Sequence, residues 1–306
     1  MNITNPYGPN TTILLPGGCN AMCSFCFWNR NESKIVPPAD YFDKVFNILN
    51  KLPEDFKTLS ISGGEPTISA YFSNFIDRLA KFRRENSYLD RVVLTTHGGN
   101  LDKHIPFIHS VVNHVNISRH AIGDKLNQEA FNSNKIPTDA QLKDLIRKIH
   151  KETSCDVTLN CVIDPEVSTE FCYEFIEYAK NLGANAVSFR KVASDALPTD
   201  AEQYFVGRYG KIKESKCPVC RGLTQNVKGF NVRWKGSVNE PSITTGGVYE
   251  AVIHPDGNVY TDWNMKVPLD LSKVKTKPKT KVKPVSIPKV SKSSSGGGCG
   301  SGGCGR

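Results

Sequence analysis

Short apolar runs alternate with amphipathic segments over the first 193 residues of the chain. Runs of aliphatic and β-branched residues predict strands, and apolar residues at helical spacing predict helices. The predicted strands cover residues 12–15, 58–62, 91–96, 111–118, 156–163 and 186–192, and the predicted helices cover residues 41–49, 71–84, 138–151 and 168–182. Because repeated β–α units favour parallel strands with helical crossovers, we expect an α/β fold, a partial (β/α)6 barrel of the TIM type.

This regular pattern ends near residue 193 and divides the chain into four parts. We expect a lead-in over residues 1–10, the barrel over residues 11–193 and a small C-terminal extension over residues 194–270. In the extension, residues 248–260 predict a hairpin that turns at Pro255-Asp256-Gly257. Residues 271–306 are rich first in Lys and Pro and then in Gly, Ser and Cys, a composition typical of a disordered tail.

The net charge of +9 lies entirely in this tail. Residues 271–306 hold nine Lys and Arg and no Asp or Glu, which leaves 30 basic against 30 acidic residues in the rest of the 306-residue chain. Nucleic acid is therefore expected as a partner only through the basic tail. No run approaches the roughly 20 apolar residues of a membrane span, and no signal peptide is visible at the N-terminus. Together with ten cysteines, these features predict a cytoplasmic protein that binds metal and has no membrane association.

Three cysteines follow the first predicted strand with the spacing C-x3-C-x2-C. They are Cys19, Cys23 and Cys26. Soft thiolates at this spacing suit an iron–sulfur cluster or zinc. Structural zinc takes four closed ligands, and no fourth Cys or His lies close by in the sequence. Three thiolates on a four-iron cluster would leave one iron open to a ligand that is not protein, so we favour the cluster.

A second motif follows the strand predicted at residues 58–62. It reads Gly63-Gly64-Glu65-Pro66. Two glycines after a strand let the backbone approach a ligand closely, and the carboxylate of Glu65 can receive an ammonium group. The run could be an ordinary turn if it stood alone, but the cysteine motif lies about 40 residues upstream.

Together, these two motifs resemble those of a radical S-adenosylmethionine (radical SAM) enzyme. The resemblance implies a [4Fe-4S] cluster on Cys19, Cys23 and Cys26, whose open iron chelates S-adenosylmethionine. It further implies that one electron, from a reductant such as flavodoxin or ferredoxin, cleaves this cofactor to a 5′-deoxyadenosyl radical. That radical would take a hydrogen atom from the substrate.

Later strand ends resemble the molybdenum-cofactor cyclase and SPASM-like branch of that superfamily. The resemblance implies that Ser118, Asn160 and Arg190 contact the cofactor; a structural salt bridge inside the barrel is the alternative for Arg190. His97 and His120 stand at predicted strand ends and are the candidates to meet substrate. Successive side chains of a strand point to opposite faces, so Cys161 faces away from its neighbour Asn160 and is expected in the core. Cys172 is expected in the core as well.

A second cysteine motif, Cys217 and Cys220, follows the predicted barrel. The resemblance implies a second, auxiliary cluster whose further cysteine follows a hairpin, but Asp262 stands near that place. Several interpretations stay open: a second iron–sulfur cluster with an Asp ligand, one completed by Cys299 or Cys304, a zinc site with His254 as a spare ligand, or no metal.

For the reaction, we expect reductive cleavage of S-adenosylmethionine and hydrogen abstraction from a peptide, as in the modification of ribosomally made peptides. The alternatives are cyclisation or other modification of a nucleotide-like small molecule, and a non-catalytic iron–sulfur carrier or redox protein. The Gly63–Pro66 run disfavours a carrier, which has no use for a cofactor ammonium site.

Overall fold

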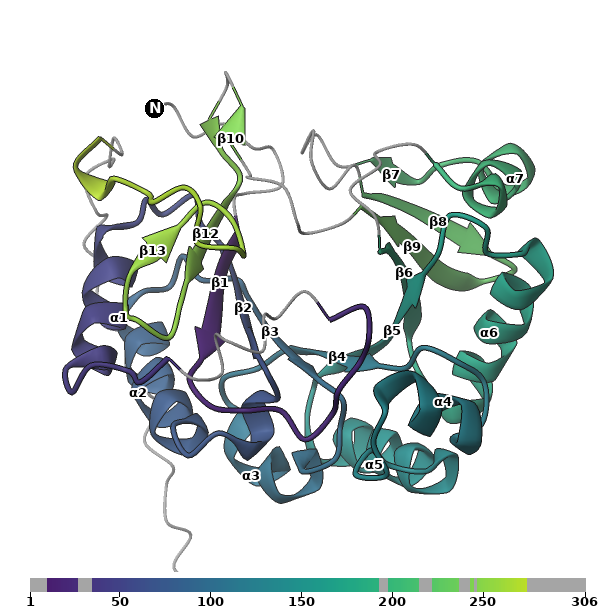
Figure 1. Ribbon diagram of the computed structural model, residues 1–306, viewed down its shortest axis with the longest axis horizontal. Helices are drawn as coiled ribbons and strands as arrows, with labels where there is room; N and C mark the ends of the chain where they lie inside the picture. The colour runs from purple at the N-terminus through teal and green to yellow at the C-terminus, as the bar shows by residue number, and fades with distance from the viewer. Residues whose placement is uncertain are drawn as a thin grey trace, which may run out of the picture.

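In the computed structural model, an arc of strands is covered on its convex side by helices (Figure 1). The structure describes residues 10–26, 35–192, 198–214, 222–236, 243–244 and 247–273. The arc is an 11-stranded sheet in the order β13-β12-β1-β2-β3-β4-β5-β6-β9-β8-β7. Because its first and last strands do not pair with each other, the sheet stays open, as a partial barrel requires.

Six parallel strands form the centre of the arc, and each predicted strand is present. They are β1 (Asn10–Leu15), β2 (Thr58–Gly63), β3 (Arg91–Thr96), β4 (His114–Ser118), β5 (Asp156–Ile163) and β6 (Ala186–Lys191). The helices between and after them are α1 (Tyr41–Lys51), α2 (Phe72–Glu85), α3 (Ile105–Ile108), α4 (Asp124–Phe131), α5 (Asp139–Glu152), α6 (Thr169–Leu182) and α7 (Asp200–Tyr209). The expected partial (β/α)6 barrel is confirmed, although α3 and α4 were not predicted.

The extension lengthens the sheet at both edges. Strand β12 (Glu250–Ile253) lies parallel to β1, and β9 (Phe230–Lys235) lies parallel to β6. Antiparallel neighbours then end the sheet: β13 (Val259–Tyr260) beside β12, and β8 (Leu223–Val227) and β7 (Lys213–Glu214) beside β9. The predicted hairpin over residues 248–260 is confirmed in β12 and β13. A separate pair, β10 (Ile243–Thr244) and β11 (Gly247–Val248), completes the strands.

Side chains alternate between the two faces of the arc. Leu159, Cys161, Val187 and Phe189 are buried in the main core under the helices. Their neighbours in sequence therefore face the concave side, which we call the lumen. Cys172 on α6 is also fully buried, so both cysteines expected in the core are found there.

Local signals fix the helix ends. Thr138 caps α5 with a capping box, in which its hydroxyl accepts from the amide of Gln141 and the Gln141 side chain accepts from the amide of Thr138. Gly183 ends α6 in the left-handed region with φ of 91°. Within the described part of the chain, no helix is long and apolar enough to cross a membrane.

Trp234 of β9 attaches the extension to the barrel. Its ring lies 4.8 Å from that of Phe189 on β6 and 5.5 Å from that of Phe205 on α7, measured between centroids. Its indole Nε1 donates to Oε1 of Gln225 at 2.7 Å.

We predict that Trp234→Ala lowers the free energy of unfolding in urea by about 3–5 kcal/mol, because it removes a buried indole and leaves a cavity. Phe107→Ala, a truncation at a ring that is 57% exposed, should cost under about 0.5 kcal/mol. Equal costs for the two variants would contradict this account of how β9 is held.

Candidate cofactor site

The three motif cysteines lie on the loop that leaves β1. In Figure 1 this loop runs across the inside of the arc of strands. Cys19 and Cys26 are exposed, Cys23 is partly exposed, and none of the three forms a disulfide with another described cysteine. The amide of Cys26 donates to the carbonyl of Cys23 at 3.2 Å, and the amide of Ala21 donates to Sγ of Cys19 at 3.4 Å.

Hydrogen bonds hold this loop against two neighbouring segments. The amide of Glu65 donates to the carbonyl of Gly18 at 3.1 Å, and the amide of Met22 donates to the carbonyl of Phe131 at 2.8 Å. The hydroxyl of Ser133 donates to the carbonyl of Asn20 at 2.7 Å. The cysteines are therefore held against the C-terminal end of β2 and the end of α4.

Two glycines make this contact with β2 possible. A Cβ atom on Gly64 would lie 2.6 Å from the carbonyl oxygen of Gly18 and 3.2 Å from Cβ of Cys19. Gly63 has φ of 141° and would place a Cβ 2.8 Å from the carbonyl oxygen of Leu15. Residues with side chains would push the cysteine loop away from β2. The glycines thus bring the backbone of the turn close to the cysteine loop. That this turn also approaches a ligand stays a prediction.

Glu65 is buried and ties the ends of β2 and β3 together. Its Oε1 accepts from the amide of Thr67 at 3.0 Å, the hydroxyl of Thr67 at 2.6 Å and the hydroxyl of Thr96 at 2.5 Å. Its Oε2 accepts from the amide of His97 at 2.8 Å. Pro66 follows as the first residue of a short 3-10 helix, Pro66–Ile68. That the Glu65 carboxylate also receives a cofactor ammonium stays a prediction.

His97 connects this carboxylate to the cysteine loop. Its Nδ1 accepts from the amide of Gly99 at 3.1 Å, so the ring proton of a neutral imidazole lies on Nε2. Nε2 then donates to Oδ1 of Asn20 at 2.6 Å, and it also lies 3.5 Å from Oε2 of Glu65. The structure places His97 under the loop, where it orients Asn20. A catalytic role for His97 stays a prediction.

His120 lies at the end of β4 and packs beside the same loop. Its ring centroid is 4.7 Å from that of Phe25 and 4.7 Å from that of Phe131. Its Nδ1 accepts from the amide of Val162 at 3.1 Å. Burial and then the charge of Arg119 lower the pKa of His120 to about 3, so the imidazole is neutral at physiological pH. A catalytic role for His120 likewise stays a prediction.

The other predicted cofactor contacts lie along the lumen. Ser118 of β4 pairs in register with Asn160 of β5, and Asn160 pairs with Ser188 of β6. The Oδ1 atom of Asn160 is buried and has no hydrogen-bond partner, an arrangement that a bound ligand would complete. Arg190 donates from Nη1 to the carbonyl of Gly236 at 3.1 Å. Contact of Ser118, Asn160 and Arg190 with the cofactor stays a prediction.

Ser188 was missed by the sequence analysis as a site residue. It is 1% exposed, and its hydroxyl is buried without a partner. The alternation that puts Ser188 on the same face as Arg190 was visible in the sequence. A lone serine in a buried strand gives no other signal.

The expected auxiliary metal site is described only in part. Cys217, Cys220, Cys299 and Cys304 lie outside the described residues. The carboxylate of Asp262 accepts from the amides of Asn264 at 2.8 Å, Lys266 at 3.1 Å and Val267 at 2.8 Å. A metal ligand role would compete with these bonds, which makes Asp262 a turn-forming residue. Within the described ranges, no group of three His, Cys, Asp or Glu side chains is arranged to hold a single ion.

His254, the spare ligand considered for zinc, is fully buried beside Asp262. Its Nε2 lies 3.3 Å from the carbonyl oxygen of Asp262, and its Nδ1 is buried without a partner. Desolvation lowers the pKa of His254, which favours the neutral ring.

The thiol of Cys19 is poorly ionised on its own, because its pKa is raised. Desolvation raises the pKa of Cys19 to about 11, the hydrogen bond from Ala21 opposes this, and the charges of Glu65 and Cys26 add to it. Cationic iron favours the thiolate over the thiol, so metal binding at this loop releases protons.

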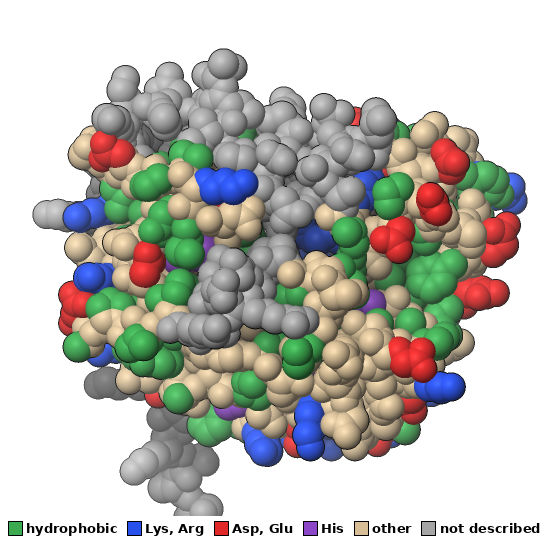
Figure 2. All heavy atoms as spheres, in the orientation of Figure 1, with side chains coloured by type: hydrophobic (Ala, Val, Ile, Leu, Met, Phe, Trp, Pro, Cys, Tyr) green, Lys and Arg blue, Asp and Glu red, His purple; other side chains and the backbone are tan. Residues whose placement is uncertain are grey.

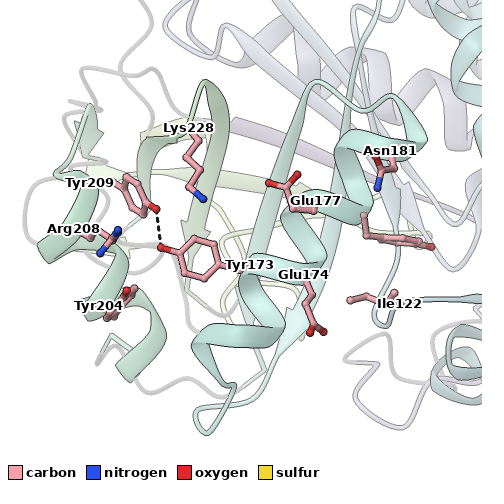
Figure 3. Close-up of a pocket in the computed structure, with 10 residues that line it drawn as sticks. Ile122, Tyr173, Glu174, Glu177, Asn181, Tyr204, Arg208, Tyr209 and Lys228 are labelled. Atoms are coloured by element: carbon pink, nitrogen blue, oxygen red, sulfur yellow. Dashed lines mark hydrogen bonds between the residues drawn. The ribbon is translucent and has the colours of Figure 1, made fainter.

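A hollow of about 780 Å³ is lined mainly by side chains of α6 and α7 (Figure 3). Tyrosines of α6 and α7 face each other across it, and the hydroxyls of Tyr173 and Tyr209 are 2.7 Å apart. It contains none of the predicted site residues.

The three cysteines of the loop after β1 lie beside a glycine turn that has no room for a side chain. This is the arrangement that the sequence analysis expected for a cluster with one iron open to a second ligand. A family comparison agrees: residues 13–182 match the model of the Radical SAM superfamily. The match covers more than half of the chain, which therefore belongs to this superfamily, as the sequence analysis expected. The cofactors of the superfamily are a [4Fe-4S] cluster and S-adenosylmethionine.

The chain is similar in sequence to GTP 3′,8-cyclase of Helicobacter pylori, with 27% identity over 175 residues, or 53% of this chain and 49% of the cyclase. Its fold is similar to that of Streptococcus suis SuiB bound to precursor peptide SuiA, with a TM-score of 0.57, 14% identity and coverage of 83% of this chain and 59% of SuiB. It is also similar to native anSMEcpe with bound AdoMet and Cp18Cys peptide, with a TM-score of 0.53, 14% identity and coverage of 86% of this chain and 74% of that one. The chain thus spans about half the length of the cyclase and about three fifths of SuiB.

The close contact at Gly64 generates a prediction about iron binding. We expect Gly64→Ala to reduce the iron retained after anaerobic reconstitution at least several-fold, because the added methyl group meets the backbone of Gly18. Gly207→Ala is the matched control, since a Cβ there meets nothing within 4 Å. Iron and sulfide per chain, measured on both folded variants, check the prediction. Full iron content in Gly64→Ala would contradict it.

The bond between His97 and Asn20 generates a second prediction. In a double-mutant cycle, His97→Ala and Asn20→Ala should be coupled by about 0.5–1.5 kcal/mol in the free energy of unfolding, the usual size of a net hydrogen bond. Urea denaturation of the two single variants and the double variant gives this number. Additive costs would show that the bond does not hold the loop.

Proposed function

We propose that this chain is a radical SAM enzyme whose catalytic cluster is held by Cys19, Cys23 and Cys26. The observation that carries the proposal is the contact between the loop of these three cysteines and the Gly63–Glu65 turn, made by the Gly18–Glu65 hydrogen bond of 3.1 Å. When bound, the cluster and S-adenosylmethionine supply one-electron cleavage of the cofactor and a radical that takes hydrogen from a substrate.

The chain's own residues would bind and orient these groups. The three thiolates would hold iron, and the backbone of Gly63 and Gly64, open for lack of side chains, would receive the amino acid end of S-adenosylmethionine. Asn160 would supply its unpartnered Oδ1 as an acceptor, with Ser118 beside it in register. Glu65 and His97 would fix the shape of this pocket, because both are buried and hydrogen-bonded to strand ends.

For the substrate we propose a ribosomally made peptide. The fold likeness to SuiB and anSMEcpe covers 83% and 86% of this chain, so it includes the extension as well as the barrel. Both of those proteins were solved with peptides bound. The sheet does not close, because its end strands β13 and β7 do not pair with each other.

The second candidate is a nucleotide-like small molecule. The sequence likeness to GTP 3′,8-cyclase favours it, although that likeness reaches only 53% of the chain. A non-catalytic iron–sulfur carrier fits less well, because the close glycine turn and the unpartnered Asn160 serve no purpose without a second ligand. A one-electron reductant of the flavodoxin or ferredoxin class is part of the proposal.

The cluster assignment generates the central activity prediction. Anaerobically reconstituted protein, reduced with dithionite, should convert S-adenosylmethionine to 5′-deoxyadenosine, and Cys23→Ala should reduce this product at least about 100-fold. Cys172→Ala, which removes a buried thiol on α6 far in sequence from the loop, should retain the activity. Chromatography of the nucleoside products measures both. Unchanged 5′-deoxyadenosine in Cys23→Ala would exclude the assignment.

A further inference from the structure

Strand β9 brings a basic surface to the lumen. Arg233 pairs in register with Ser188, and Lys235 pairs with Arg190. Trp234, between them in sequence, packs on the opposite face against Phe189 and Phe205. Arg233 and Lys235 therefore face the lumen beside Ser188, as a strand requires. Figure 2 shows Lys and Arg side chains inside the opening of the arc.

Positive charge exceeds negative charge on this wall. Desolvation, followed by the charges of Arg91, Arg233 and Lys235, lowers the pKa of the lumen residue His114 to about 3. Within the described residues, Arg91 and Arg233 form no ion pair with a carboxylate, and Nη1 of Arg233 donates to Oγ1 of Thr158 at 3.4 Å. Asp156 is the acidic group that acts on Arg233 from further away.

The acidic group on the opposite wall is already engaged. Oε1 of Glu250 on β12 accepts from the side chains of Asn10 at 3.0 Å and Thr12 at 2.5 Å. Its Oε2 accepts from Nε1 of Trp263 at 3.3 Å. Glu250 is therefore held on its own side of the lumen, with the apolar group Leu14, Val252 and Trp263 next to it.

An unpartnered donor lies next to these cations. The hydroxyl of Ser188 is buried without a partner, and Ser188 lies between Asn160 on β5 and Arg233 on β9 in register. Buried polar atoms without a partner are rare, because each one loses its hydrogen bonds to water. A ligand that accepts a hydrogen bond and carries negative charge would pair with the Ser188 hydroxyl and be attracted by the charges of Arg233 and Lys235.

We propose that Ser188, Arg233 and Lys235 form a substrate subsite for a carboxylate, supplied by an acidic side chain of the peptide. This proposal rests on the proposed function for its choice of a peptide. The Ser188 hydroxyl donates to one carboxylate oxygen, and the guanidinium and ammonium groups provide the charge. The subsite lies on β6 and β9, and β9 falls outside the residues 13–182 that match the superfamily model.

The test uses full-length protein loaded with its cluster and S-adenosylmethionine, and a displayed library of random twelve-residue peptides. Each selected peptide is resynthesised with Glu or Asp replaced by Gln or Asn, and dissociation constants are measured. Wild type should prefer the acidic peptide by about tenfold or more, the value expected of a charge-assisted hydrogen bond. Arg233→Gln, Lys235→Met and Ser188→Ala should each reduce this preference.

Two control variants carry the same Arg→Gln and Lys→Met substitutions at exposed positions outside the lumen. Arg208→Gln on α7 and Lys228→Met in the turn before β9 alter exposed cations of the outer surface and should keep the preference. Ser188→Ala removes one atom only, so it remains informative if a charge variant misfolds. A preference that is absent in wild type, or that persists in all three lumen variants, would overturn the subsite.

A second arm separates failure of the subsite from failure of the proposed function. Binding of inorganic tripolyphosphate is measured on the same variants by calorimetry. If no peptide binds but tripolyphosphate binding is lost in the lumen variants, the anion subsite stands and the peptide assignment is wrong. If peptides bind without any acidic preference, the proposed function stands and the subsite is wrong.

Discussion

The site depends on one close backbone contact, in which the cysteine loop lies directly on the glycine turn after β2. A Cβ on Gly64 would come within 2.6 Å of the Gly18 carbonyl oxygen, so the contact exists only because position 64 has no side chain. The amide of Glu65 then bonds that same carbonyl, while its carboxylate is fixed by Thr67, Thr96 and His97. These hydrogen bonds hold the ends of β2 and β3 and the cysteine loop in one arrangement.

The hydrogen bonds of Glu65 explain why a buried carboxylate is tolerated under the cysteine loop. A carboxylate in the interior is costly unless its hydrogen bonds are complete, and Glu65 has four. His97 extends the same network to Asn20 between the first two cysteines. The length of the histidine side chain brings its Nε2 to the loop.

Much of this could be predicted from the sequence. The periodicity of apolar residues predicted the strands and helices of the partial barrel, and the cysteine spacing with Gly63-Gly64-Glu65-Pro66 predicted the family. Both are local patterns in the sequence. The role of Glu65 as a tie between strands was not predicted, since its partners Thr96 and His97 lie some 30 residues away in sequence. The docking of β9 and β12 on opposite edges of the sheet was equally hidden, because strand pairing between distant segments leaves no local signal. The pairing of β9 with β6 is what brings Arg233 and Lys235 next to Ser188 in the lumen.

The central claim is that S-adenosylmethionine binds directly to a cluster on Cys19, Cys23 and Cys26. Electron paramagnetic resonance of the dithionite-reduced protein tests it most directly, on a Cys217→Ala/Cys220→Ala variant that removes any signal from a site at those two cysteines. The account predicts a reduced [4Fe-4S] signal whose g values shift when S-adenosylmethionine is added. A signal that is identical with and without S-adenosylmethionine, or that survives Cys23→Ala unchanged, would contradict it.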